Sequence, residues 1–287
     1  MSVADLRQGI QNLDSLPALP VIAQRLLALD LESHEGERKL LELIEQDPFI
    51  SAKLVGLANT PLFVMPQKVT RLSDAAMLLG LTRVKSVAMG IAIMTSVANK
   101  PLGRLDLDKL WLHSLAVALG MRTLAHAMPR ERRPDDETLF LVGLLHDIGY
   151  VVLARLDPIR SDALHMRLAT DTSLTVSGFE REMFEMGHAE LGAALARHWG
   201  LPEDIGAVLR DQHADAVAMD ASGQPLLDLL RLTEKLLGPV GIHEGVLAEV
   251  VEDDWRRLGI DPARADELAS FLRQQAEEAK ASAQRFA

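Results

Sequence analysis

The stretch LVGLLHDIGY (141–150) places a histidine and an aspartate side by side at the end of a nearly unbroken apolar run. A run of this kind is expected to lie inside the protein, where an unpaired carboxylate costs several kcal/mol. His146 and Asp147 must therefore be hydrogen-bonded or bound to a metal. The pair is the first indication of a polar site inside a hydrophobic core.

The flanking sequence has the periodicity of helices. Apolar residues recur at intervals of three and four, and the β-branched runs that mark strands are short. In VIAQRLLALDL (21–31), for example, Val21, Ile22, Leu26 and Leu29 fall on one face. We therefore predict an all-α fold, a helical bundle, whose later helices lie near 108–127, 136–154, 158–169, 176–186, 188–199, 203–214, 225–237 and 261–285. In the last of these, Leu268, Phe271 and Leu272 form an apolar stripe.

Short signals divide the first hundred residues into helices. Asp47 and Pro48 predict an N-cap and a first-turn proline for the helix FISAKLVGLAN. Ser73 is predicted to cap the next helix and Gly80 to end it. Thr82 is then predicted to cap a longer helix, which is apolar on most sides and should be buried at the centre of an N-terminal bundle.

The stretch NKPLGRLD (99–106) interrupts the helical pattern, and the charge balance changes just after it. We place a boundary there. Residues 1–100 are predicted to form an N-terminal helical subdomain that packs on a second helical subdomain, 101–240. Residues 241–287 are predicted to form a C-terminal helical extension.

Two loops lead to further expectations. LANTPLFVMPQKV (57–69) carries Phe63, Val64 and Met65 between prolines, and apolar loop residues either cover an internal joint or meet another surface. Asp215, two residues after His213, is expected to be exposed. Asp147 is expected to be buried.

Composition and charge exclude several classes of protein. With 48% hydrophobic and 25% charged residues, the chain can bury a substantial core. The net charge is −11, and residues 1–100 carry 10 basic and 10 acidic groups, so the acidic excess lies C-terminal to them. An acidic surface repels phosphate backbones, and we expect no direct nucleic-acid binding. Apolar stretches are interrupted before the ~18 residues of a membrane span, so we expect a cytoplasmic protein without a membrane segment.

Nine histidines are available as metal ligands in a chain without cysteine. A lone histidine is usually exposed or capped, and His34, in the polar turn ESHEGE, is expected to be solvated. His113, His188 and His213 differ, since each lies near an apolar helical stretch, as His146 does. Neutral imidazoles and carboxylates suit a first-row divalent ion, and a carboxylate between two ions can bridge them. Ligands on separate helices leave no tight spacing, so a structural role for these histidines stays open.

The motif LLHDIG (144–149) resembles the signature of the HD superfamily of metal-dependent phosphohydrolases. The chain resembles one branch of it, the HDOD domain, over roughly residues 14–238. The resemblance is carried by LPALP (16–20), LIEQDPFISAKLVGLAN (43–59), VTRLSDAAMLLGLTRVKSVAMGIA (69–92), LWLHSLAVALG (110–120), LFLVGLLHDIG (139–149), GHAELGAALARHWGLPEDI (187–205) and LLRLTEKLLG (229–238).

This resemblance implies an all-α fold in which residues 101–240 are an HD-like helical subdomain. It also implies a signalling or regulatory role in bacteria, with a protein partner from a two-component or cyclic-nucleotide pathway. Enzymatic activity is generally not established for the branch. The implied cofactor is a divalent metal, either Fe, Mn, Zn, Ni or Mg.

The same resemblance implies a ligand set drawn from several segments. In chain order, His113 corresponds to the first superfamily ligand, and His146 with Asp147 corresponds to the HD pair. His188 and His213 correspond to the later histidines of the larger sites, and Glu234 corresponds to the last acidic ligand. The superfamily has aspartate where this chain has Glu234, whose side chain is one methylene longer.

Three departures from the catalytic pattern count against an enzyme. Tyr150 stands where the catalytic branch usually has lysine, and Gln212 replaces the first of a histidine pair. No glycine-tyrosine-proline motif follows His213. These departures favour a non-catalytic signalling module that binds a protein or ligand and keeps an inherited metal site. The alternative is a metal-dependent phosphohydrolase or phosphodiesterase acting on a nucleotide, for which no catalytic residue beyond the metal ligands is assigned.

Overall fold

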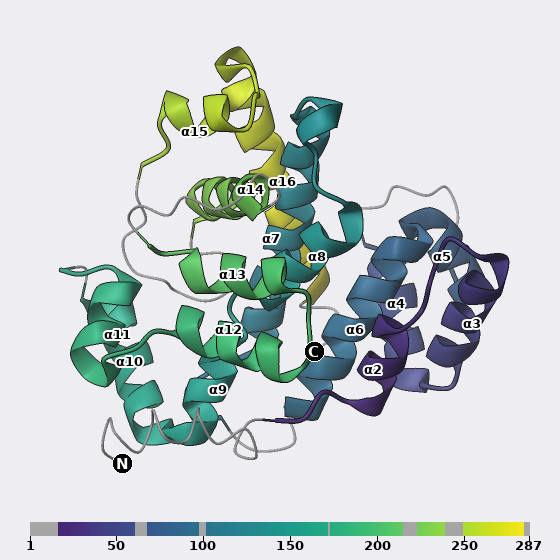
Figure 1. The fold of residues 1–287 in the computed structure, drawn as a ribbon, viewed down its shortest axis with the longest axis horizontal. Helices are drawn as coiled ribbons and strands as arrows, with labels where there is room; N and C mark the ends of the chain where they lie inside the picture. The colour runs from purple at the N-terminus through teal and green to yellow at the C-terminus, as the bar shows by residue number, and fades with distance from the viewer. Residues whose placement is uncertain are drawn as a thin grey trace.

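The computed structural model describes the chain in six segments: 17–60, 68–97, 102–171, 173–214, 223–238 and 249–283. Helices and short connections make up these segments, and no β-strand is assigned within them (Figure 1). The predicted all-α fold is confirmed. Phe63, Val64 and Met65 of the predicted loop, and Asp215, lie outside the described residues.

Five helices from the first part of the chain gather on the right of Figure 1. They are α2 (Val21–Leu27), α3 (His34–Glu45), α4 (Pro48–Ala58), α5 (Leu72–Leu79) and α6 (Leu81–Val97). Each of the first four contacts α6, which explains why the sequence of α6 is apolar on most sides. The predicted start of α4 is confirmed, because Asp47 accepts hydrogen bonds from the backbone N–H groups of Phe49 and Ile50 at 3.0 and 3.1 Å.

Two of the predicted caps are wrong. α5 begins at Leu72, ahead of Ser73, and α6 begins at Leu81, directly after Gly80, so Thr82 already lies inside the helix. Gly80 does end α5, with a φ of +86° that favours glycine. The chain turns so sharply there that α5 and α6 lie at 115° to each other.

The second part of the chain is built around the long helix α7 (Leu107–Ala127), which contacts α8, α14 and α16. α8 also contacts α6 and so joins the two groups of helices (Figure 1). After the short 3₁₀ helix η2 (Arg130–Arg132), the helices are α8 (Asp136–Leu145), α9 (Gly149–Leu156), α10 (Pro158–Thr170), α11 (Val176–Phe184), α12 (His188–His198), α13 (Glu203–Asp211) and α14 (Gly223–Leu237).

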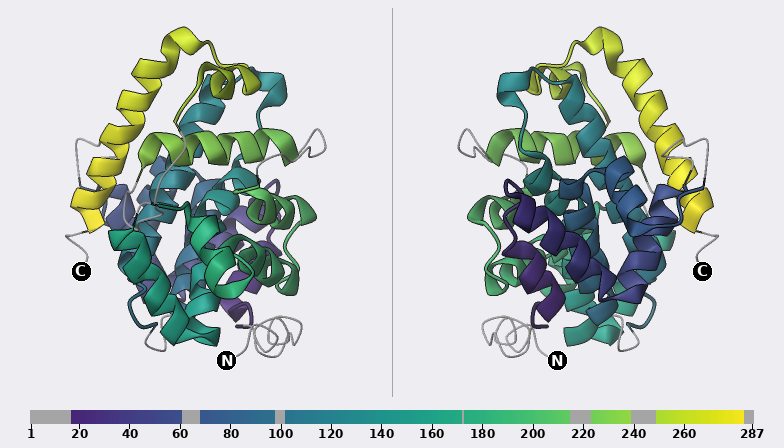
Figure 2. Two further views of the ribbon diagram at one scale, coloured as in Figure 1. Left: turned by 90° about the vertical axis from the view of Figure 1, so that its left-hand side faces the viewer. Right: turned by 90° about the vertical axis from the view of Figure 1, so that its right-hand side faces the viewer.

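The C-terminal part consists of α15 (Glu252–Arg257), the 3₁₀ helix η3 (Pro262–Arg264) and α16 (Ala265–Ala283). α16 runs along one side of the protein (Figure 2) and packs against α7 and α14. Leu268 and Leu272 are buried as predicted, but Phe271 is 49% exposed. The predicted apolar stripe is therefore wrong at Phe271. The division into three parts at residues 101 and 241 stays a prediction.

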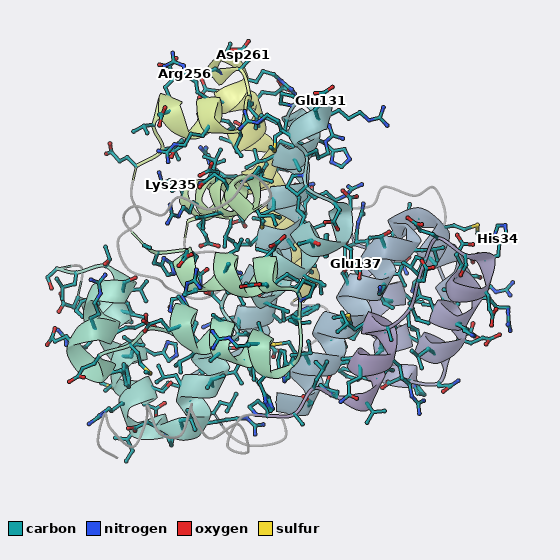
Figure 3. The ribbon with its side chains drawn as sticks, in the orientation of Figure 1. His34, Glu131, Glu137, Lys235, Arg256 and Asp261 are labelled. Atoms are coloured by element: carbon teal, nitrogen blue, oxygen red, sulfur yellow. The ribbon has the colours of Figure 1, made fainter. Side chains whose placement is uncertain are left out.

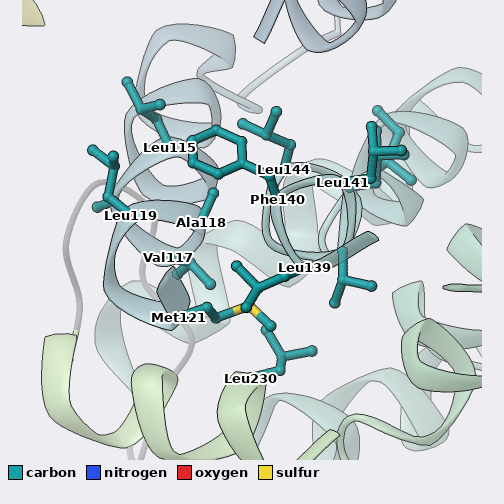
Figure 4. Close-up of a cluster of buried hydrophobic side chains, with 14 of the residues drawn as sticks. Leu115, Val117, Ala118, Leu119, Met121, Leu139, Phe140, Leu141, Leu144 and Leu230 are labelled. Atoms are coloured by element: carbon teal, nitrogen blue, oxygen red, sulfur yellow. The ribbon is translucent and has the colours of Figure 1, made fainter. Parts of the chain in front are cut away.

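The core between α7 and α8 positions the HD motif. Figure 4 shows Val117, Met121 and Leu139 among the buried side chains of this cluster, which are shielded almost completely from solvent. The two helices approach closely at Gly143, where a Cβ would come within 2.5 Å of the Cα of Ala118. Glycine is required at that position because any larger residue would push α8 away from α7.

The predicted single helix 136–154 is wrong, since the chain forms α8 and α9 with a tight turn between them. The backbone N–H groups of Ile148 and Tyr150 bond to carbonyl groups three residues earlier, at 3.0 and 3.1 Å. Such 3₁₀ bonds tighten the backbone relative to an α-helix. His146 and Asp147 therefore lie at a local irregularity and not in a regular helix.

The segment Asp136–Leu156 has the length and composition of a membrane span, with a mean hydropathy of 1.7. The expectation that no apolar stretch is long enough is therefore wrong by this measure. However, 89% of the apolar stretch within this segment is buried inside the protein. A core helix passes the same test, and its apolar side chains pack here against the rest of the fold.

Candidate metal centre

The turn between α8 and α9 presents His146 and Asp147 to the interior, with side chains 1% and 0% exposed. His146 Nδ1 lies 2.9 Å from the carbonyl oxygen of Gly143. Because a carbonyl only accepts, this contact places the proton of the neutral ring on Nδ1. The lone pair on Nε2 is then directed at the neighbouring ligand candidates, as in metal-bound histidines.

Glu234 from α14 and His113 from α7 meet His146 at this point. The Nε2 atoms of the two histidines are 3.2 Å apart, and Glu234 Oε1 lies 3.4 Å from His113 Nε2 and 3.1 Å from His146 Nε2. Their possible ligand atoms all lie within 4.8 Å of one another. Three helices that are distant in sequence thus place three donor groups around one point.

Asp147 faces two groups of histidines with its two carboxylate oxygens. Oδ2 lies 3.4 Å from His113 Nε2 and 3.3 Å from His146 Nε2, whereas Oδ1 lies 3.4 Å from His188 Nε2. None of the four carboxylate oxygens of Asp147 and Glu234 makes a hydrogen bond of good geometry among the described residues. Buried carboxylates require positive charge nearby, either from protonated imidazoles or from a bound cation.

His188 and His213 form the second group. His188, the first residue of α12, lies with its Nε2 3.0 Å from His213 Nε2, just beyond the end of α13. The predicted histidines are therefore brought together with the HD pair. The approach of α12 to the HD turn requires Gly149, because a Cβ there would collide with the carbonyl oxygen of His188.

Sequence reasoning missed Glu180 of α11, which is 1% exposed. Its Oε1 accepts hydrogen bonds from Nδ1 of His188 at 2.7 Å and from the backbone N–H of His188 at 3.1 Å. A carboxylate in this position fixes the ring of a ligating histidine and makes the other nitrogen a better donor. The only signal in the sequence is an acidic residue eight positions before a histidine, which is too common to recognise.

The ionisation of the cluster reflects its buried carboxylates. Burial alone would lower the pKa of His113, but the charge and hydrogen bonding of Glu234, together with the charge of Asp147, raise it to about 9. In His213, burial and then the charge of His188 lower the pKa to about 3. His213 is therefore a neutral ligand candidate at pH 7, whereas the carboxylates hold a proton on His113 when no metal is bound.

The residues fit a divalent metal. Two donors bound to one ion at about 2.1 Å lie about 3.0 Å apart in an octahedral site and about 3.4 Å apart in a tetrahedral one. The contacts around His113, His146, Asp147 and Glu234 span 3.1–3.4 Å, so they lie within the range of these two donor spacings. Imidazole and carboxylate donors without thiolates suit Fe, Mn, Zn or Ni, and Mg would have to rely on the carboxylates.

Two departures noted in the sequence have defined structural roles. The ring of Tyr150 stacks on the imidazole of His188, with centroids 4.2 Å apart and an angle of 18° between planes. The Gln212 amide donates a hydrogen bond from Nε2 to the carbonyl oxygen of His146 at 2.9 Å. Both side chains therefore support the cluster by packing and backbone contacts.

An all-helical fold with buried histidines and carboxylates around a His-Asp turn defines the HD class of domains. Within that class, the HDOD domain matches residues 16–215. The match covers more than half of the chain, and the protein belongs to the HDOD domain family.

Solved structures share this fold. A proposed signal transduction protein from Marinobacter aquaeolei VT8 is 25% identical, with a TM-score of 0.79 over 98% of this chain and 65% of that one. An HDOD domain protein of unknown function from Geobacter sulfurreducens is also 25% identical, with a TM-score of 0.75 over 96% and 97%. A proposed phosphohydrolase from Shewanella amazonensis SB2B is 23% identical, with a TM-score of 0.71 over 94% and 96%, which shows the fold alone.

Among curated proteins, an uncharacterized protein of Treponema pallidum is 26% identical over 205 residues. The match covers 70% of this chain but 38% of that protein. The chain thus corresponds to part of the length of this relative and to about two thirds of the Marinobacter structure.

Proposed function

We propose that this HDOD protein is a non-catalytic signalling module whose histidine–carboxylate cluster is a structural metal centre. The observation that carries the proposal is the enclosure of the cluster. The side chains of His113 and His146 are 1% exposed, that of Asp147 is 0% exposed and that of Glu234 is 11% exposed. A hydrolytic metal needs an open position that a substrate can reach.

The ligands proposed for the centre are His113, His146, Asp147 and Glu234, with His188 and His213 completing the other side of Asp147. A bound divalent ion would supply the positive charge that the buried carboxylates require. Glu180 holds the His188 ring in place from behind. The centre would thereby fix α7, α8, α12 and α14 relative to one another, because these helices carry most of the ligands.

The alternative is a metal-dependent phosphohydrolase or phosphodiesterase acting on a nucleotide. One observation favours it: the two oxygens of Asp147 face separate histidine groups, as a carboxylate bridging two ions would. Against it, Tyr150 supplies no positive charge for a phosphoryl group and is itself stacked on His188. The structural role is therefore preferred.

Hydrolysis assays separate the two functions. The protein, loaded in turn with Mn, Fe, Ni and Zn, is incubated with bis(p-nitrophenyl) phosphate and with cyclic dinucleotides. We expect no turnover above that of Asp147→Asn, which removes the bridging carboxylate. Metal-dependent turnover that disappears in Asp147→Asn would establish the hydrolase instead.

We propose that the partner is a protein of a two-component or cyclic-nucleotide pathway and that it binds in the cytoplasm. The proposal rests on family membership and on the signalling assignment proposed for the Marinobacter protein. The acidic excess of the chain argues against a nucleic-acid partner. Cross-linking in a bacterial host, followed by mass spectrometry of captured proteins, tests this: recovery of nucleic acid without a signalling protein would contradict it.

A further inference from the structure

Two helices in the second part of the chain have a proposed metal ligand at one end and contact the N-terminal part, residues 17–97, at the other. α8 is followed directly by His146, and α12 begins with His188. At 1.5 Å per residue, the opposite ends of these helices lie roughly 13–17 Å from the ligands. A helix in a close-packed interior moves as a rigid element, so a displacement at one end reaches the other.

The start of α8 is tied to the N-terminal part by a buried ion pair. Lys85 of α6, whose side chain is 4% exposed, lies 2.7 Å from Oε1 of Glu137, at the place where Glu137 is labelled in Figure 3. Lys85 also donates a hydrogen bond to the carbonyl oxygen of Leu29, between α2 and α3, at 2.8 Å. One ammonium group therefore joins α6, the connection between α2 and α3, and α8.

The end of α12 is tied to the N-terminal part by a buried tryptophan. Trp199, the C-cap of α12, is 7% exposed, and its indole Nε1 donates a hydrogen bond to the carbonyl oxygen of Pro17 at 2.8 Å. The segment that begins at Pro17 leads into α2, and the carbonyl oxygen of Leu19 accepts a hydrogen bond from the Gln24 side chain of α2 at 2.7 Å. The start of the N-terminal part is thus held against the end of α12.

The ligand ends of the two helices meet at Asp147. Its Oδ2 lies 3.3 Å from His146 Nε2, and its Oδ1 lies 3.4 Å from His188 Nε2. A divalent ion bound beside this carboxylate would hold its ligand atoms at about 2.0–2.2 Å and in a fixed geometry. The relative position of the two helix ends therefore depends on whether the centre is filled.

We propose that the occupancy of the metal centre controls how firmly the N-terminal helices are held against the rest of the protein, and that α8 and α12 transmit the effect. The inference rests on the metal centre proposed above and adds what its occupancy changes. One route ends at the ion pair of Glu137 with Lys85, and the other ends at the hydrogen bond from Trp199 to Pro17. A signalling partner that contacts the N-terminal helices would thereby sense a centre that it does not touch.

Thermodynamic linkage makes the proposal testable in both directions. If bound metal strengthens the two contacts, then weakening the contacts must weaken metal binding by the same factor. Couplings between distant sites are typically about 5- to 150-fold. Neither contact involves a proposed metal ligand, so a loss of metal affinity on changing them has no local explanation.

Hydrogen–deuterium exchange of the full-length wild type tests the first direction without any substitution. The protein is stripped of metal with a chelator, and exchange is followed by mass spectrometry before and after addition of one equivalent of Mn²⁺. We expect the amides of residues 17–29 and of α6 to exchange at least about fivefold more slowly with Mn²⁺ bound. These segments contain the N-terminal partners of both contacts.

The double variant Glu137→Gln/Trp199→Phe tests the second direction, because it removes one charge and one indole donor at the two contacts. Its Mn²⁺ affinity, measured by competition with a coloured chelator, should be at least about fivefold lower than that of the wild type. The matched control is Glu35→Gln/Trp255→Phe. Glu35 is 65% exposed, whereas Trp255 is 3% exposed and belongs to α15, which lies away from the N-terminal helices (Figure 1). The control should bind Mn²⁺ as the wild type does.

Three results would overturn the proposal. A wild type that binds no divalent ion would remove the metal centre itself and this inference with it. One ion bound per chain with unchanged exchange at residues 17–29 would leave the centre in place and refute the transmission alone. The third is a Mn²⁺ affinity of the double variant that is no lower than that of its control, since any loss would then reflect general stability.

Discussion

Replacing Asp147 by asparagine removes one negative charge from the centre of the cluster and keeps the size of the side chain. The carboxylate lies within 3.3–3.4 Å of the ring nitrogens of His113, His146 and His188 and is completely buried. An asparagine amide can bridge neither two ions nor two protonated imidazoles. The variant should therefore lose its metal and leave buried histidines without a counter-charge.

The expected loss of stability follows from these contacts. Removing one partner of a buried charge pair costs ~3–5 kcal/mol. At about 2 °C per kcal/mol for a chain of this size, the melting temperature should fall by roughly 6–10 °C. Asp253→Asn is the control, because Asp253 is 65% exposed and its ion pair with Arg257 is worth ~0.2–1 kcal/mol at most.

Differential scanning calorimetry of the wild type and both variants, purified in parallel, checks this expectation. Circular dichroism shows whether each variant keeps its helix content. Equal melting temperatures for Asp147→Asn and Asp253→Asn would refute the reasoning. They would mean that the buried Asp147 contributes no more to the stability of the protein than an exposed aspartate does.

Three further predictions concern the same centre. Glu180→Gln should weaken metal affinity about tenfold in a competition assay with a coloured chelator, because it removes the charge behind His188, whereas Glu182→Gln, an exposed change on the same helix, should not. Removing the metal with a strong chelator should lower the melting temperature of the wild type by roughly 8 °C if the ion is present at ~1,000 times its Kd, and re-addition of metal should restore it. Metal binding at pH 7 should release at least one proton, because His113 has a pKa of about 9 without metal and binds in its neutral form. The metal affinity should therefore rise as the pH rises towards 9. Calorimetry in two buffers of different ionisation enthalpy measures the released protons, and a result of no released proton would contradict the ligand role of His113.

Periodicity and short local signals correctly predicted several buried segments and one helix cap. The apolar run that ends at His146 is buried, α6 lies at the centre of the N-terminal helices, and Asp47 caps α4. These features depend on residues close in sequence. Pattern-based reasoning can reach them without knowledge of the tertiary fold.

The errors arose where tertiary packing decides. Ser73 has the chemistry of an N-cap, but the helix already starts at Leu72, which is buried and fixes the beginning of α5. Phe271 fits the helical spacing of Leu268 and Leu272, yet α16 turns it outward. The break after Leu145 could not be predicted either, since the periodicity of 141–154 is continuous and only the tight turn of the HD pair interrupts it.

The grouping of the centre was accessible only through the resemblance. His113, His146 and Glu234 lie on or beside three helices, and nothing in their spacing shows that these helices meet. Glu180 belongs to no recognised motif, and its role depends on how α11 meets the start of α12. Contacts between distant segments therefore set the limit of prediction from the sequence.

The measurement that tests the central claim most directly is the metal content of the purified protein, determined by mass spectrometry of the elements without added metal or chelator. The structure predicts at least about one divalent ion per chain in the wild type and a loss of most of it in Asp147→Asn. A wild type with far less than one ion per chain, no different from Asp147→Asn, would contradict a metal centre at this site.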